Sequence, residues 1–302
     1  ITLVFVLFNI LPGDPARMML GQRADEKSIE AIHKELGLDK PLHHQYCKYI
    51  YDLSHFDLRR SYQSGKPVVD ILKEAFPNTI YLALLSIAIA FVLGVTLGSL
   101  AAVFKDGWLE KIILVITSLG MSLPSFFAAI LIAWIFAFLL ADYTGLSMFG
   151  SLYSVDDFGE GEYLSLKNII LPAVTLGIRP LAVITELTKS TMKEVLAQDY
   201  IRTARAKGLS KFKVIYSHAL RNTLNPIVSS VSGWFASLIA GAVFVEYIFD
   251  WKGVGVVIVD SLEKYDFPVL MGALIVICVI LIVINVLTDI IYALLDPRVR
   301  IK

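Results

Sequence analysis

The sequence predicts an all-α membrane protein with six transmembrane helices, and three observations carry this prediction. First, 56% of the 302 residues are hydrophobic, compared with roughly 45–50% in soluble domains. Second, the apolar residues gather in long runs and do not follow the period of an amphipathic helix or strand, which is typical of lipid-facing segments. Third, Lys and Arg are unequally shared among the segments that join these runs, as expected of a chain with a fixed orientation.

The first apolar run, residues 1–11, has about half of the roughly 20 residues that a helix needs to cross the hydrocarbon core. We therefore interpret 1–11 as part of a truncated first helix. A polar segment follows at 13–76, with ten basic and ten acidic residues. Two helical patterns are expected in it, one over 25–36 that ends at Gly37 and one over 41–53 that begins with proline. The segment is thus expected to be a small helical insert outside the membrane.

Residues 77–302 are expected to hold helices 2–6 of the transmembrane domain. Three of the apolar runs in this region contain or begin with proline, which membrane helices tolerate when neighbouring helices satisfy the freed carbonyl groups. The five predicted membrane-spanning runs are 78–104, 112–140, 168–187, 226–249 and 269–295.

The basic residues predict the orientation of these helices. The loop at 189–225, between helices 4 and 5, has eight Lys or Arg and two carboxylates, whereas the loop at 141–166 has five carboxylates and no Lys or Arg. Because Lys and Arg favour the cytoplasmic side, the 189–225 loop and both termini are expected in the cytoplasm. The insert is then extracytoplasmic, and its length exempts it from the charge rule.

The 189–225 loop contains a pattern with two readings. A short basic helix from Asp199 is expected to stop at Gly208, and Ser210 is expected to cap a second helix. One apolar face of that helix is predicted from the spacing of four residues. The element could lie on anionic lipid or dock in a groove of a partner protein. The four face residues are Phe212, Ile215, Tyr216 and Ala219.

The same loop resembles the cytoplasmic EAA loop of ABC importer permeases, E-A-A-x₃-G-x₉-I-x-L-P, in the form found in the dipeptide/oligopeptide/nickel permease family. Ala204 and Leu220 match its second alanine and its leucine when counted from Gly208, and residues 199–226 match the family's variant DYxRTARAKGLS…HALRN…P. Arg202, Thr203, His218 and Arg221 depart from the general consensus. Further similar segments are LPGDP at 11–15, LGLDKPL at 36–42, SLPSF at 122–126, GAVFVE at 241–246, and Asp289 with YALLDPR at 292–298.

The resemblance implies a permease subunit that forms half of a pathway for peptides or a related small solute in the bacterial inner membrane. Its implied partners are a second homologous permease, two cytoplasmic ABC ATPases and an extracytoplasmic solute-binding protein. The residues implied in ATPase docking are Ala204, Arg205, Gly208, Phe212, Ile215, Tyr216 and Leu220. Nickel or another solute of the same family is the alternative cargo.

The chain itself is expected to be neither an enzyme nor a cofactor-binding protein. It has no G-x-x-x-x-G-K-[ST] motif for nucleotide phosphates, so ATP is expected on the partner subunits. Its formal net charge of zero gives no indication of nucleic-acid binding. A self-contained secondary transporter is less favoured because the two halves show no matching broken helices. A membrane enzyme would need more converging polar groups than the apolar runs contain.

Several residues in or near the apolar runs are candidates for the pathway or its gate. They are Arg179, Glu186, Glu246, Trp251 and Asp289. For those within the runs the alternative is a structural partner or an interhelical hydrogen bond. The segment from Glu246 through Trp251 resembles the outer gate of the family, with a plain loop as the alternative. Histidines and a cysteine in the insert raise the question of a metal site, but their spacing matches no metal motif, so surface side chains are expected. These are His33, His43, His44, His55 and Cys47.

Overall fold

The computed structural model describes residues 2–3, 5–6, 16, 25–150, 153–155 and 162–295. Most of the predicted first helix at 1–11 therefore lies outside the described residues. The chain divides into two compact units. The first comprises Ile1–Thr79 and Lys252–Ile280, and the second comprises Ile80–Trp251 and Leu281–Lys302.

The insert in the first unit is helical, as predicted. Helix α3 (Glu26–Leu36) ends at Gly37, whose φ of 71° lies in the left-handed region, and α4 (Leu42–Ser54) follows Pro41. After α4, a β-bridge between Arg60 and Pro67 closes a turn that leads into α5 (Val68–Val103). Both helical patterns that the sequence indicated in the insert are thus confirmed.

Buried hydrogen bonds fix the remaining elements of the first unit, α14 (Val254–Glu263) and the start of α15 (Phe267–Leu295). The buried carboxylate of Asp266 accepts the Ser61 hydroxyl and the backbone N–H of Tyr62, the latter at 3.0 Å. The Thr79 hydroxyl accepts the backbone N–H of Val254 at 2.9 Å. The turn between α4 and α5 is therefore held against the beginning of α15. The short helix α14 was not predicted from the sequence.

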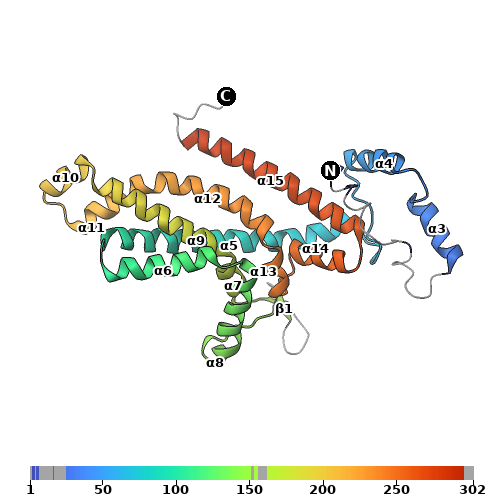
Figure 1. Ribbon diagram of the computed structural model, residues 1–302, viewed down its shortest axis with the longest axis horizontal. Coiled ribbons are helices and arrows are strands. Elements are labelled where there is room, and N and C mark those ends of the chain that lie inside the picture. The colour runs from blue at the N-terminus through green and yellow to red at the C-terminus, as the bar shows by residue number, and fades with distance from the viewer. Residues whose placement is uncertain are drawn as a thin grey trace. The chain divides into compact units, whose positions relative to one another are not determined.

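The second unit is built around α9 (Lys167–Leu196), which packs against α6, α7, α12 and α13 (Figure 1). Helix α5 also approaches α9 closely, because a Cβ on Gly98 would lie 2.5 Å from the carbonyl oxygen of Thr185. Only glycine fits this contact. The other elements are α6 (Trp108–Ser122), α7 (Ser125–Ile132), the π-helix η2 (Ala133–Leu139), α8 (Ala141–Thr144), α10 (Asp199–Ala206), α11 (Lys211–Lys213), the π-helix η3 (Val214–Leu220), α12 (Arg221–Gly241) and α13 (Val243–Ile248).

Three of the described helices are long and apolar enough to cross a membrane: Val68–Val103, Lys167–Leu196 and Phe267–Thr288. They correspond to the predicted second, fourth and sixth runs. The prediction of one continuous helix over 112–140 was wrong, because α6 and the following Ser125–Leu139 helix meet at 115°. Leu123 has ψ 130°, the extended conformation that a following proline favours. If this bent pair is counted as one crossing, the described helices that could span number four.

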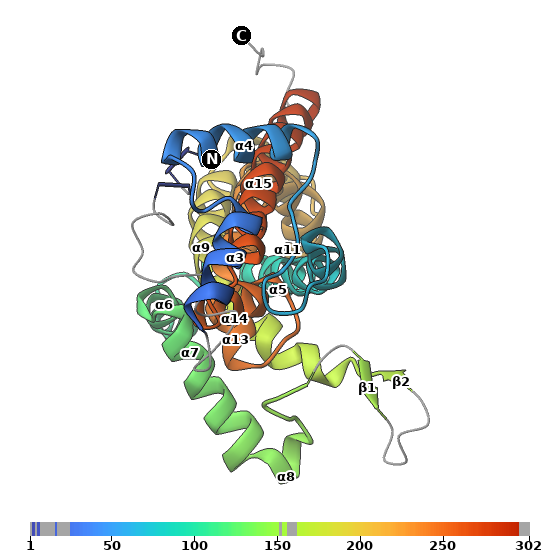
Figure 2. The same ribbon diagram turned by 90° about the vertical axis from the view of Figure 1, so that its right-hand side faces the viewer.

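Two further expectations about the chain after α8 are corrected. The predicted fifth run at 226–249 does not begin a new helix, since Pro226 lies inside α12 and the helical path runs on from Lys211 to Gly241. The predicted fifth run is instead interrupted at Ala242, where α12 gives way to α13. The loop before α9 contains an antiparallel hairpin of β1 (Tyr153–Val155) and β2 (Glu162–Leu164), visible in Figure 2.

Candidate functional site

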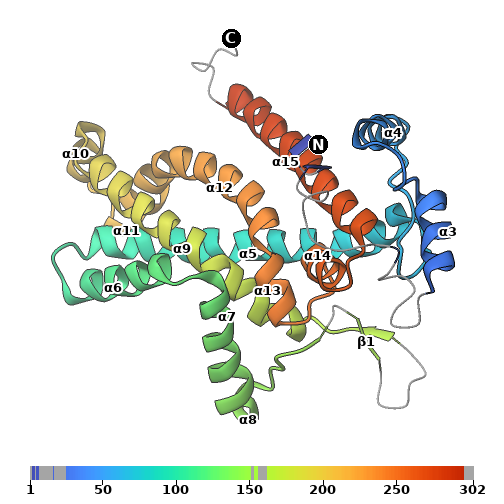
Figure 3. The same ribbon diagram turned by 45° about the vertical axis from the view of Figure 1, so that its right-hand side comes forward.

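The 199–220 element, formed by α10, α11 and η3, joins the ends of α9 and α12 (Figure 3). Its inner side is apolar and contributes four buried residues to a cluster that also contains Ala102 of α5 and Met192 of α9. The Asn222 side-chain amide donates to the Tyr200 hydroxyl at 2.8 Å and so joins α12 to α10. The element is therefore a packed extension of the helices and not a free loop. The four buried residues are Ile201, Ala204, Val214 and Ala219.

The turn inside the element follows the sequence prediction. Gly208 has φ 79°, a left-handed conformation that costs an L-residue with a side chain about 1–2 kcal/mol. The side chain of Ser210 accepts the backbone N–H of Lys213 at 3.4 Å and caps the next helix. The predicted helix stop and helix cap are both confirmed.

The outer side of the element carries two exposed aromatic rings. Phe212 and Tyr216 are 77% and 64% exposed, and their rings stack with centroids 5.9 Å apart. The predicted single apolar face is wrong, because Ala219 is buried and Ile215 is half-buried against the inner cluster. The π-helix η3 explains the difference, since i→i+5 bonding changes which residues share a face.

The remaining predicted docking residues divide between the two sides of the element. Ala204 is buried and Leu220 packs against the inner cluster, whereas Arg205 and Gly208 are exposed. Ala204 and Leu220 thus lie on the inner side of the element, and its exposed residues include the aromatic pair, Tyr200 and five basic residues. These basic residues are Arg202, Arg205, Lys207, Lys211 and Lys213.

The structure also brings together an ionic cluster that the sequence did not indicate. Glu110, in the first turn of α6, pairs with Lys189 at 2.7 Å and Lys193 at 2.8 Å near the end of α9. The partners are as many as 83 positions apart in the chain. No local pattern could have revealed them, because only the packing of α6 on α9 places them together.

The pathway and gate candidates differ in burial among the residues that the structure describes. Arg179 and Glu186 are exposed on α9, and no ion pair of either is found within the described residues. Glu246 and Trp251 are fully buried, and the Trp251 backbone N–H donates to the Glu246 carbonyl at 2.8 Å. The Asp289 side chain lies outside the described residues. The roles proposed for these five residues therefore stay predictions.

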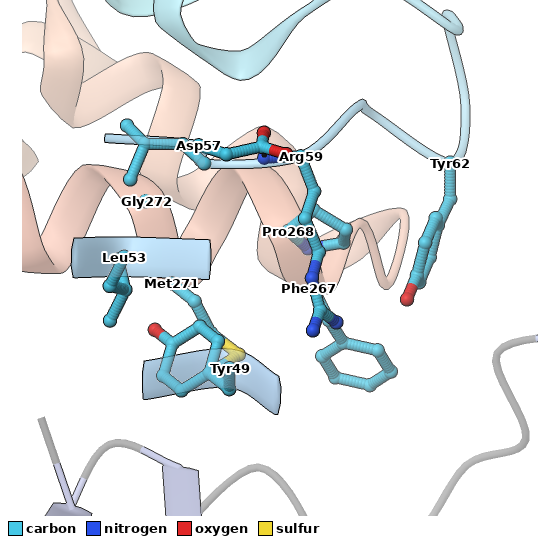
Figure 4. Close-up of a pocket in the computed structure, with 10 residues that line it drawn as sticks. Tyr49, Leu53, Asp57, Arg59, Tyr62, Phe267, Pro268, Met271 and Gly272 are labelled. Atoms are coloured by element: carbon cyan, nitrogen blue, oxygen red, sulfur yellow. Dashed lines mark hydrogen bonds between the residues drawn. The ribbon is translucent and has the colours of Figure 1, made fainter. Parts of the chain in front are cut away.

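A pocket in the first unit lies among α4, the chain after it and the start of α15 (Figure 4). Arg59 donates to the Asp52 carboxylate at 2.8 Å, and burial raises the pKa of Tyr49 to about 12. The cavity has a volume of about 40 Å³. Sites for small organic ligands typically measure roughly 300–1,000 Å³, so the pocket is too small to be a peptide site.

The histidines of the insert do not form a metal centre within the described part of the chain. His43 and His44 lie side by side with ring centroids 5.0 Å apart. No group of three or more His, Cys, Asp or Glu side chains that could hold a metal ion occurs among the described residues.

Comparison with known proteins assigns the chain to a family. Residues 94–301 match the family described as "Binding-protein-dependent transport system inner membrane component", and residues 1–83 match its N-terminal companion. A Brucella abortus (strain 2308) protein named as a peptide transport system permease is 40% identical over 99% of this chain and 93% of its own length. The "Glutathione transport system permease protein GsiC" of Escherichia coli (strain K12) is 36% identical over the same shares.

Solved structures show the same fold at low sequence identity. An inward-facing structure of the MetNI methionine ABC transporter aligns with a TM-score of 0.58 and 16% identity, over 76% of this chain and 97% of that chain. An amino acid ABC transporter aligns with a TM-score of 0.52 and 12% identity, over 76% and 95%. The chain belongs to the binding-protein-dependent transport system inner membrane component family, and it is a non-catalytic membrane permease subunit of an ABC importer.

Proposed function

We propose that this permease docks on its ATPase subunits through the outer side of the 199–220 element. The observation that carries the proposal is the Phe212–Tyr216 stack, which stands exposed on an element whose inner side is packed. Aromatic residues and arginine are enriched in protein-binding surfaces, and the exposed residues of the element include Arg202 and Arg205 as well as the aromatic pair. Because the element is continuous with α9 and α12, a force applied to it reaches two membrane helices.

The proposed topology has six crossings with both termini in the cytoplasm. Four of these crossings are the three long helices α5, α9 and α15 and the bent pair at 108–139. The other two are residues 1–11 and the α12–α13 pair. The eight Lys or Arg residues at 189–225 support a cytoplasmic position for the element, and the insert then faces the solute-binding protein. The exposed thiol of Cys47 in α4 gives a direct test.

In a Cys278→Ala background, a membrane-impermeant maleimide should label Cys47 on intact spheroplasts. A matched protein with Ser210→Cys as its only cysteine should react only after the membrane is opened. Labelling of the two sites in the reverse order would contradict the topology.

We further propose that the cargo is a peptide or a related small solute and that the pathway lies between this chain and a second, homologous permease. The names of the relatives, a peptide and a glutathione permease, support this cargo class. The chain is proposed to hold no cofactor, with ATP bound by the partner subunits.

The test of this proposal is purification of the tagged chain after co-expression with the neighbouring ATPase and permease genes, followed by reconstitution with the binding protein. ATPase subunits should co-purify, and labelled peptides should enter the vesicles when ATP is supplied. Uptake of nickel in place of peptides would overturn the cargo assignment. A chain that transports alone, without ATPase subunits, would overturn the docking proposal.

A further inference from the structure

The first turn of α6 carries a nearly buried carboxylate with three donors around it. The Glu110 side chain is 8% exposed, and its Oε1 accepts Lys189 Nζ at 2.7 Å and Lys193 Nζ at 2.8 Å. Its Oε2 accepts the backbone N–H of Asp106, in the turn between α5 and α6, at 2.6 Å. Charge-assisted bonds of this kind hold side chains in a defined geometry. We call Glu110, Lys189 and Lys193 the Glu110 clamp.

The clamp lies next to the attachment of the 199–220 element. Lys189 and Lys193 are one helical turn apart on α9, and the same turn contributes Met192 to the buried cluster of the element. Met192 is fully buried, and its sulfur lies 3.6 Å from the Thr223 hydroxyl oxygen of α12. One turn of α9 therefore contacts the element through Met192 and α6 through the two lysines.

Separating the clamp would leave the Glu110 carboxylate, whose side chain is 8% exposed, without its two lysine partners. Removing one partner of a buried, hydrogen-bonded ion pair is strongly unfavourable because the other charge stays behind without compensation. The ends of α6 and α9 are thus held together at the point where the element joins α9. At its other end, α6 leads through the bend at Pro124 into α7, which contacts α9 and α13.

We propose that Glu110 is a positioning residue for transport, which makes α6 and α7 follow α9 when the ATPase subunits move the 199–220 element. The inference rests on the proposed docking function and adds the route by which motion leaves the element. A clamp that served stability alone would affect assembly or unfolding, but not the amount of solute moved per ATP. The number of solute molecules imported per ATP hydrolysed therefore separates the two roles.

The experiment uses the complete transporter in proteoliposomes and compares Glu110→Gln with Lys111→Gln. Lys111 is the exposed neighbour of Glu110, and none of the ion pairs among the described residues includes it. With Glu110→Gln, ATPase subunits should co-purify at the wild-type level and ATP hydrolysis should continue. The number of solute molecules imported per ATP hydrolysed should fall about fivefold or more. A factor of about five is the lower end of the range that is typical for energetic coupling between two sites. Lys111→Gln should behave as wild type.

Rescue by charge exchange sharpens the test. Glu110→Lys alone should lower the number of solute molecules imported per ATP. The double variant Glu110→Lys with Lys189→Glu should recover much of this transport ratio. A wild-type ratio in an assembled Glu110→Gln transporter overturns the proposal, as does an exchange variant no better than Glu110→Lys.

If Glu110→Gln does not assemble, Lys193→Met replaces it, because this change leaves the Lys189 pair in place. A reduced ratio then supports the clamp, and an unchanged ratio overturns it. Failure of the docking proposal itself looks different: the exposed Phe212 would then make no contact with the ATPase subunits that co-purify with the wild-type chain.

Discussion

Replacement of Gly208 by valine isolates the backbone conformation of the turn in the 199–220 element. Its φ of 79° is left-handed, and no atom lies within 4 Å of the position of an added Cβ. A side chain therefore meets strain in the backbone but no collision. The strain is about 1–2 kcal/mol for an L-residue, which corresponds to a factor of roughly 5–30 in a two-state population. A β-branched residue is among the least suited to this conformation.

We expect Gly208→Val to lower ATP-driven peptide uptake by a comparable factor, while the chain still inserts into the membrane. Gly208→Asn is the matched control, because asparagine enters the left-handed region more readily than other residues and adds a side chain in the same open space. Uptake in proteoliposomes should rank wild type, Asn and Val in that order. Normal uptake with Val would refute the reasoning. Equal losses with Asn and Val would show that the absence of a side chain, and not the φ angle, is what matters.

Three further outcomes are expected. The Arg179→Leu variant should insert into the membrane at least as well as wild type, because a charge at mid-membrane costs about 2.5–3.5 kcal/mol. Its uptake, or its co-purification with the second permease, should fall. Full activity would contradict a role for this exposed side chain. Deletion of residues 24–51, which removes α3 and most of α4, should abolish stimulation of ATP hydrolysis by the binding protein while the ATPase subunits still co-purify. Asp266→Ala should destabilise the first unit by about 2 kcal/mol or more, since hydrogen bonds to charged groups contribute about 1.5–3 kcal/mol each. The loss is measured by thermal unfolding in detergent and by the rate of protease cleavage within residues 61–66.

Hydropathy predicted the positions of the long helices because lipid exposure requires continuous apolar runs. It could not predict the bend at Pro124. Proline removes a backbone donor wherever it occurs, but whether the helix kinks or turns by 115° depends on the neighbouring helices. Helix α14 was missed for a related reason, since its ten residues are too few to stand out from the adjoining loop.

In the candidate site, the turn was predictable and the faces of its helix were not. Gly208 and Ser210 act through their own backbone and immediate neighbours, so their roles could be inferred from local sequence. The π-helix η3 has no comparable local signature, and it moves Ala219 inward while Phe212 and Tyr216 stay exposed. The partners of Glu110 are brought to it only by tertiary packing.

The measurement that tests the account most directly is site-specific photocrosslinking from Phe212. A photoreactive phenylalanine analogue is placed at Phe212 or, as the matched control, at Phe138 in η2. The two residues are 77% and 73% exposed in the single chain. With the complete transporter in membranes, Phe212 should crosslink to the ATPase subunit and Phe138 should not. A Phe212 position that gives no ATPase adduct, or a Phe138 position that gives an equal one, would contradict the proposed docking surface.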